Sequence, residues 1–244
     1  MKARAGFTLI ELMVSMALGA VVLLLAVGAL RAVGDGYGRS TDGVAAEREA
    51  RAVLTQAAED LSKGVGGREM VFERNGEGWR RDRLGFFCLQ PADAQSDAER
   101  VGDLCAVVYY VEDIEIGGDT VRCLMRGFRG SGETFEALRN DNETSLFARE
   151  DADEPVAFGV VSFEVNPVLR EDDGWTEWRA EEDPEWTGPD AVGLRVVVAR
   201  RELIAKLRDS GGWNGSPLLG EPEEADRSDQ LEIYEILQSF AHAS

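Results

Sequence analysis

The sequence predicts an α+β fold in which a long N-terminal helix packs on an antiparallel β-sheet head. Three observations support this prediction. Residues 7–30 are almost wholly apolar, residues 41–64 have the period of an amphipathic helix, and strand-like segments separated by turns and loops follow residue 67. A helix followed by strands without intervening helices indicates an α+β fold rather than a parallel sheet with crossover helices.

The apolar run of residues 7–30 is longer than the roughly 20 residues that a helix needs to cross a bilayer. Lys2 and Arg4 precede it, which favours a cytoplasmic N-terminus and an exported C-terminal region. A cleaved secretory signal is the alternative. Two features weigh against that alternative: the run is longer than the usual core of a signal peptide, and Glu11 would lie inside this core.

A carboxylate inside a membrane helix is costly, so Glu11 is a candidate functional residue. It ends the segment GFTLIE, residues 6–11, which resembles the processing motif of type IV prepilins and type II secretion pseudopilins. The resemblance implies that a prepilin peptidase cleaves between Gly6 and Phe7 and that Phe7 is N-methylated. It also implies that Glu11 assists assembly by pairing with the N-terminal amine of a neighbouring subunit, since buried charges are tolerated when paired. The alternative for Glu11 is a side chain that reaches the membrane surface from the helix end.

A second helical segment is predicted to begin near Thr41 and to end at Gly64. Three glycines at positions 34–38 separate it from the apolar run and weaken helical structure there. Its apolar residues recur with helical spacing and predict one face that packs on a sheet. These residues are Ala46, Ala50, Val53, Leu54, Ala57, Ala58 and Leu61.

Strands are predicted beyond residue 67 by runs rich in β-branched and aromatic residues. A glycine pair, Gly117 and Gly118, predicts the turn of a hairpin. A short helix is expected at residues 201–208, a loop at 211–227, and either a strand or a helix at 231–237. The predicted strands cover residues 70–73, 84–89, 105–111, 158–165 and 192–199, with the hairpin at 114–124.

An acidic stretch at residues 141–190 contains two carboxylate clusters. Such clusters can hold calcium through oxygen ligands, and this makes Ca2+ the one candidate cofactor. The candidate ligands are Asp172, Asp173, Glu182 and Asp183. Since no EF-hand spacing is present, the sequence favours a solvated loop.

Residues 174–178, GWTEW, and residues 189–194, PDAVGL, are similar to a pattern in J-type minor pseudopilins. PilW-like minor pilins share several of these features. Trp175 and Trp178 are interpreted as packing residues, and Pro189 as the residue before a strand. The resemblance implies a pilin-like fold and a minor subunit of a type II secretion pseudopilus. A minor pilin of a type IV pilus is the alternative, and an anchored acidic calcium-binding module is more remote.

These interpretations divide the chain into a leader (1–6), a membrane-spanning assembly helix (7–30), a joint with an amphipathic helix (31–64) and a β-rich head (65–244). The resemblance further implies a single-pass protein of the inner membrane with its head in the periplasm. The implied partners are other pseudopilins or pilins, the prepilin peptidase and the inner-membrane assembly platform.

Charge and composition narrow the remaining classes of function. The net charge of −20 argues against nucleic-acid binding, which needs clustered Lys and Arg. His242 is the sole histidine, and no nucleophile elbow, P-loop or zinc-protease motif appears, so no enzyme is predicted. In an oxidising compartment Cys105 can pair with Cys88 or with Cys123. Three free thiols are an equal alternative.

Overall fold

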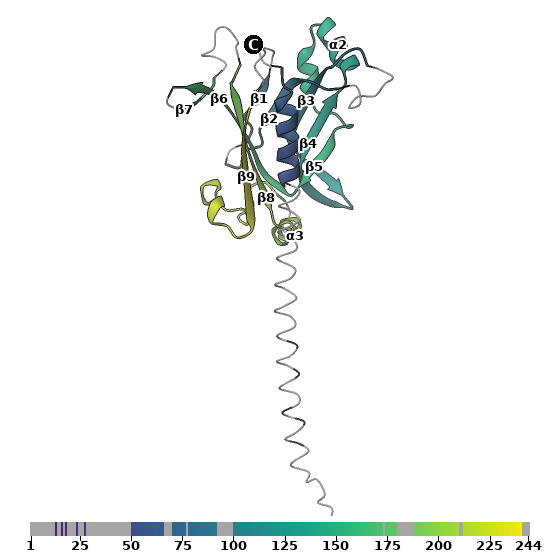
Figure 1. Cartoon of the computed structure of the whole chain (residues 1–244). Coiled ribbons are helices and arrows are strands. Elements are labelled where there is room, and N and C mark those ends of the chain that lie inside the picture. The colour runs from purple at the N-terminus through teal and green to yellow at the C-terminus, as the bar shows by residue number, and fades with distance from the viewer. Residues whose placement is uncertain are drawn as a thin grey trace, which may run out of the picture. The chain divides into compact units, whose positions relative to one another are not determined.

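The computed structural model describes residues 50–65, 70–76, 78–91, 100–172, 174–179, 188–209 and 212–240, and five isolated residues nearer the N-terminus (Figure 1). The chain divides into two compact units, Met1–Val44 and Ala45–Ser244. In the first unit, the described residues Met13, Met16, Leu18, Leu23 and Val27 are helical. The second unit contains all the strands named below.

The first sheet of the second unit has five antiparallel strands in the order β1-β2-β3-β4-β5. Its centre is the hairpin of β3 and β4, which turns at Gly117 and Gly118 as predicted. Both glycines have positive φ, at 64° and 93°, a conformation that glycine adopts without steric cost. The strands are β1 (Val71–Glu73), β2 (Arg83–Leu89), β3 (Leu104–Ile116), β4 (Asp119–Arg129) and β5 (Glu154–Phe158).

The second sheet has four antiparallel strands in the order β7-β6-β8-β9. The segment whose pattern suited either a strand or a helix is the edge strand β9, which pairs along its whole length with β8. Pro189 precedes β8, as predicted. The strands are β6 (Val160–Glu171), β7 (Gly174–Glu177), β8 (Ala191–Ala199) and β9 (Leu231–Ser239).

The helix of residues 50–62 packs between faces of the two sheets (Figure 1). Its predicted apolar face is largely confirmed: Ala50, Val53, Leu54, Ala57 and Leu61 are buried, while Ala58 is only partly buried and Ala46 lies outside the described residues. They share one core with side chains of β2, β3 and β4 on one side and of β6 and β8 on the other. Burying this stripe removes apolar surface from water, which is the dominant favourable term in folding. The predicted start of this helix, near Thr41, lies outside the described residues.

The opposite face of each sheet is covered as well. The helix α2 (Ser131–Arg139) and the 3-10 helix η2 (Glu143–Phe147) pack over the first sheet. The helix α3 (Arg201–Asp209), the loop of residues 212–220 and the 3-10 helix η4 (Pro222–Arg227) cover the second. The predicted short helix at residues 201–208 is therefore confirmed, and the predicted loop at 211–227 contains the 3-10 helix η4.

Two sequence expectations are wrong. Beyond the strand that was predicted at 158–165 and is present as β6, the acidic stretch of residues 141–190 is not a solvated loop, because it also contains η2, β5 and β7. On β6, the residues from Val160 to Phe163 are buried, Glu164 pairs with arginines, and Glu171 at the strand end is exposed, so a high acid content did not prevent strand formation. Trp175 is not a packing residue, because it lies on the edge strand β7 and is 43% exposed. Trp178 is buried, as predicted.

Candidate functional site

The predicted processing and assembly residues Gly6, Phe7 and Glu11 lie outside the described residues. Within the same apolar run, the five described helical residues expose between 41% and 69% of their surface. None of the helices in the described ranges is both long and apolar enough to span a membrane.

A buried carboxylate fixes the helix of residues 50–62 to the first sheet. Asp60 is 4% exposed and accepts two hydrogen bonds from Arg126, at 2.8 Å from Nε and 3.2 Å from Nη2. The hydroxyl of Tyr109 donates a third at 2.6 Å, and Nε2 of Gln90 a fourth at 3.1 Å. Four donors from three strands or strand ends thus converge on one side chain of the helix.

The electrostatics of this cluster follow from its burial. Burial, and then the charge of Asp60, raise the pKa of Tyr109 far above its ordinary value, so its hydroxyl stays a proton donor. Burial alone would lower the pKa of Arg126, but the hydrogen bonds and charge of Asp60 outweigh it and raise that pKa. The Tyr109 hydroxyl and the Arg126 guanidinium therefore both keep their protons near neutral pH and act as donors to Asp60.

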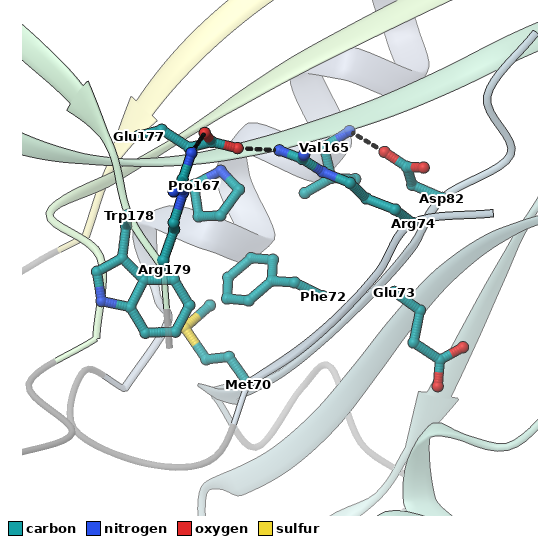
Figure 2. Close-up of a pocket in the computed structure, with 10 residues that line it drawn as sticks. All are labelled: Met70, Phe72, Glu73, Arg74, Asp82, Val165, Pro167, Glu177, Trp178 and Arg179. Carbon is teal, nitrogen blue, oxygen red and sulfur yellow. Dashed lines mark hydrogen bonds and ion pairs between the residues drawn. The ribbon is translucent and has the colours of Figure 1, made fainter. Parts of the chain in front are cut away.

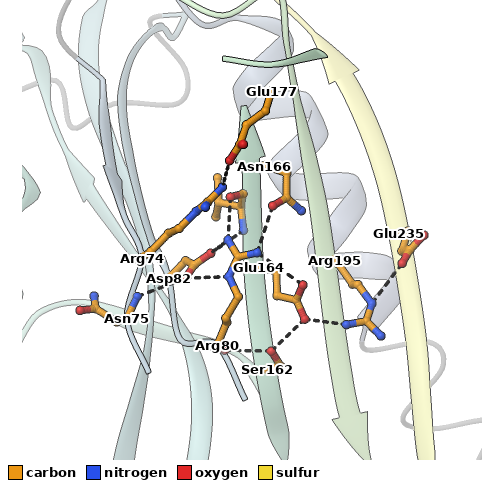
Figure 3. A network of polar contacts seen from close by, with 11 residues as sticks. Arg74, Asn75, Arg80, Asp82, Ser162, Glu164, Asn166, Glu177, Arg195 and Glu235 are labelled. Atoms are coloured by element: carbon orange, nitrogen blue, oxygen red, sulfur yellow. Dashed lines mark hydrogen bonds and ion pairs between the residues drawn. The ribbon is translucent and has the colours of Figure 1, made fainter. Parts of the chain in front are cut away.

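A second polar network joins the two sheets (Figure 3). Asp82, 1% exposed, accepts hydrogen bonds from the Arg80 guanidinium and, at 2.9 Å, from the backbone N–H of Val165 on β6. Arg80 also donates to Asn166 and to the carbonyl oxygen of Val165, both at 3.0 Å. This network crosses from the start of β2 to β6, so it sets how the two sheets meet.

The same network continues along the second sheet. Glu164 on β6 lies 3.6 Å from Arg80 and accepts a hydrogen bond from Arg195 on β8 at 2.6 Å. Arg195 in turn pairs with Glu235 on β9 at 3.1 Å. Charges therefore alternate across neighbouring strands, an arrangement that favours this register.

A cleft of about 540 Å³ opens where β1 approaches β6 and the segment after β7 (Figure 2). Its apolar wall is formed by Met70, Phe72 and Trp178, and the rings of Phe72 and Trp178 meet edge to face at 5.5 Å. At its rim, Arg74 and Arg179 both donate to Glu177. Hydrogen bonds from Arg74 and then Arg179 lower the pKa of Glu177.

Each carboxylate that lines this cleft has an arginine partner: Glu73 pairs with Arg83, Asp82 with Arg80, and Glu177 with Arg74. Of these three carboxylates, Glu177 has a pKa below its ordinary value, which favours the ionised form over the protonated form that a general acid needs. The arrangement suits contact with an apolar side chain flanked by charge, rather than acid–base chemistry.

The candidate calcium ligands are only partly described. Asp172 is exposed, next to the end of β6, while Asp173, Glu182 and Asp183 lie outside the described residues. Within the described ranges, no three acidic, cysteine or histidine side chains gather closely enough to hold a metal ion.

The three cysteines are buried free thiols. Cys88 and Cys105 lie directly opposite each other on β2 and β3, while Cys123 on β4 lies opposite Glu112. The expected alternative of a Cys105–Cys123 disulfide is wrong. Glu112 is about 23 Å along the strand from Cys105 at about 3.3 Å per residue, whereas bridged Cα atoms lie within about 7 Å. The two thiols also belong to different core clusters, on opposite faces of the sheet.

The role of Asp60 in a buried ion pair was not predicted, although its position in the helix pointed to it. Asp60 follows Ala57 by three positions and Val53 by seven, so it lies on the apolar stripe of the helix. A carboxylate on such a stripe predicts a buried cationic partner. Arg126 lies 66 positions away, and its identity as the partner required the register of the sheet.

Comparison with known proteins adds one finding about the N-terminal segment. Residues 1–27 match the family model described as the prokaryotic N-terminal methylation motif. The chain therefore carries a prepilin-type N-terminal methylation motif. No match was found among curated proteins.

Among solved structures, the chain is similar to a type IV-like pilin from Thermus thermophilus. The sequence identity is 14%, the similarity covers 78% of this chain and 92% of that chain, and the TM-score is 0.38. This likeness is too distant to carry an argument.

Proposed function

We propose that this chain is a minor pilin-like subunit of a periplasmic filament, most like the J-type subunit of a type II secretion pseudopilus. The observation that carries the proposal is the match of residues 1–27 to the methylation motif, since this segment contains Gly6, Phe7 and Glu11. The proposed role is structural rather than enzymatic.

In the proposed mechanism, residues 1–6 are a leader that a prepilin peptidase removes in the inner membrane. Phe7 then becomes the N-terminal residue and is methylated. The cationic amine of Phe7 on one subunit pairs with the carboxylate of Glu11 on its neighbour inside an apolar helix bundle. Neither charge tolerates that environment alone, so a subunit out of register would leave a buried charge unpaired.

Residues 7–30 would hold the subunit in the inner membrane before assembly, with the head in the periplasm. Within the head, the ion pair of Asp60 and Arg126 fixes the last turns of the helix of residues 50–62 to the first sheet. A force or displacement along the helix would therefore reach the sheet through a buried contact. The proposed partners are other subunits with the same motif and the inner-membrane assembly platform.

A minor pilin of a type IV pilus is the second candidate, because the same motif supports it equally. Deletion of the gene separates the two functions. Loss of secretion of folded periplasmic proteins with surface pili retained supports the pseudopilin. Loss of pili with secretion retained supports the minor pilin.

The variant Glu11→Ala tests the assembly mechanism. We expect this variant to be cleaved and inserted into the membrane but to be depleted from sheared filaments, as measured by immunoblotting. Ser15→Ala, one helical turn further along, is the matched control and should assemble normally. Normal incorporation of Glu11→Ala would contradict the proposed pairing with the amine of Phe7.

A further inference from the structure

A second cavity, of about 600 Å³, lies away from the cleft of Figure 2 and is lined by three separate parts of the chain. These are the turn between β1 and β2, the start of β4, and the loop that follows α3. They bring together two tryptophans and two arginines: Trp79, Arg81, Arg122 and Trp213. The volume lies within the range of about 300–1,000 Å³ that is typical of ligand pockets.

The walls of this cavity are fixed by hydrogen bonds. Trp213 is 3% exposed, and its indole N–H donates to the carbonyl oxygen of Thr120 at 3.2 Å. The indole N–H of Trp79 donates to the carbonyl oxygen of Gly220, also at 3.2 Å. Both rings belong to or pack against the core cluster that covers the second sheet. The cavity is thus preformed, which reduces the entropic cost of binding.

Of the two arginines that line the cavity, Arg122 already has an acidic partner. Arg122 is 2% exposed and makes two hydrogen bonds to Asp113, at 2.7 and 3.1 Å, and one to Asn214, at 2.6 Å. Its guanidinium carbon also lies 5.5 Å from the centre of the Trp213 ring. Its charge is balanced by Asp113, and its role is to hold the loop of residues 213–222 against β4.

Arg81 differs from its neighbours. Arg81 is a partly buried residue, and its guanidinium makes no hydrogen bond or ion pair within the described part of the chain. The nearby Arg80 and Arg83 pair with Asp82 and Glu73. The backbone of Arg81 is held by a hydrogen bond to Asn75 at 2.6 Å and by a bridge to Phe163. In a chain of net charge −20, an arginine whose backbone is held and that has no acidic partner among the described residues is a candidate anion-binding group.

We propose that this cavity binds a carboxylate carried beside an apolar group, in an extended acidic segment of a partner protein. Arg81 supplies a planar fork for the carboxylate, and Trp79 with Pro217 and Pro222 supplies apolar surface beside it. The cavity offers one uncompensated cation and is also lined by Glu221, so a singly charged carboxylate fits better than a doubly charged phosphate. Glycines at positions 76, 78, 215 and 220 expose backbone that an extended peptide can meet. The proposal is independent of the filament role.

Peptide titration of the full mature chain in detergent tests the site. The probes are acetyl-Leu-Glu-Leu-amide and its neutral counterpart acetyl-Leu-Gln-Leu-amide, followed by calorimetry and by tryptophan fluorescence. We expect the acidic peptide to bind about tenfold more tightly than the neutral one, because a hydrogen bond to a charged group is worth about that much. Arg81→Gln should weaken binding of the acidic peptide by about tenfold or more, and Arg81→Lys by less.

Arg139→Gln is the matched control, because this exposed arginine at the end of α2 loses the same charge without lining the cavity, and it should leave binding unchanged. Thermal melting checks that each variant is folded. If Arg81→Gln fails to fold, Arg81→Lys still decides, since equal affinity for the two peptides in that variant would contradict the proposal. An acidic peptide that does not bind the unaltered chain, or that binds Arg81→Gln equally well, would overturn it. Tighter binding of inorganic phosphate than of the peptide would overturn it as well.

Discussion

The carboxylate of Asp60 and the guanidinium of Arg126 form a buried two-point ion pair that joins the helix of residues 50–62 to β4, at 2.8 and 3.2 Å. A buried pair adds little stability relative to apolar residues, yet breaking it leaves one charge without a partner. Its effect is therefore to fix one rotation and one register of the helix on the sheet.

Replacement of Asp60 by Asn should destabilise the head strongly. Asn keeps the size of the side chain but removes its charge and presents an NH2 group to the donors of Arg126 and Tyr109. We expect a loss of about 3 kcal/mol or more in the free energy of unfolding, which lowers the melting temperature by roughly 10 °C. Thermal melting followed by circular dichroism measures this change.

Glu59→Gln supplies the control, because Glu59 is the exposed neighbour on the same helix. Exposed substitutions change stability by about 0.5 kcal/mol or less. Equal melting temperatures for the two variants would show that the pair does not hold the helix.

Gly127 on β4 is required for close packing in the first sheet. A Cβ atom at this position would lie 2.6 Å from Oδ1 of Asp153 and 2.7 Å from Cγ1 of Val108. Gly127→Ala should therefore cost about 1–3 kcal/mol, as overpacking does elsewhere. Gly130→Ala, where a Cβ would meet nothing within 4 Å, should cost less in the same denaturant titration, because it changes only the N-cap of α2. Equal stability of the two variants would contradict the packing.

The elements that the sequence predicted well are those with a strong local period. The buried face of the helix at residues 50–62, the hairpin at Gly117 and Gly118, and the helix α3 all follow from spacing within one segment. The sequence predicted one antiparallel sheet, whereas the structure has two. The local sequence of a strand does not indicate which of two sheets it joins. Long-range pairing, such as that of Arg80 with β6, makes that division.

Other features escaped prediction because local composition misleads. The helix α2 is only nine residues long, and the short strands β5 and β7 lie in an acidic stretch that resembles a loop by composition. Arg81 could not be distinguished from Arg80 by sequence, since both lie in one short turn with alternating charges. Only the fold shows that Arg80 faces Asp82 while Arg81 lines a cavity.

Asp153 should make the stability of the head depend on pH in the acid range. Burial raises the pKa of its carboxyl, but hydrogen bonds from Arg129 and then Tyr110 outweigh burial, so the pKa is below its ordinary value of 3.8. Because the folded pKa is the lower one, the unfolded chain takes up this proton first on acidification. The stabilisation that the ionised Asp153 carboxylate gives to the folded state is complete above pH 3.8. It is lost as the pH falls through the pKa of Asp153 in the folded protein.

The gap in free energy of unfolding between the unaltered chain and Asp153→Asn should therefore shrink as the pH falls from about 5 to about 3. Urea titrations at a series of pH values measure it. Asp151→Asn, at an exposed position, is the control for loss of one carboxylate. A gap that widens on acidification would have the wrong sign for this account.

The three thiols should be inert in the folded protein. Burial raises the pKa of Cys88 to about 12 and that of Cys105 to about 11, and Cys123 is buried as well. The thiolate is the form that reacts with a thiol reagent, so at about pH 8 almost no cysteine of the folded protein should react. In denaturant without reductant, all three cysteines should react. A count of one in denaturant would instead indicate a disulfide between Cys88 and Cys105, the two that face each other.

The central claim concerns the N-terminus, and mass spectrometry of the mature protein tests it most directly. We expect the purified chain to begin at N-methylated Phe7, with residues 1–6 removed. The variant Gly6→Leu should remain uncleaved, because a prepilin peptidase accepts only a minimal side chain before the cut, and Gly19→Leu should be cleaved normally. A chain that begins at Met1, or one that begins after the apolar run of residues 7–30, would contradict the account.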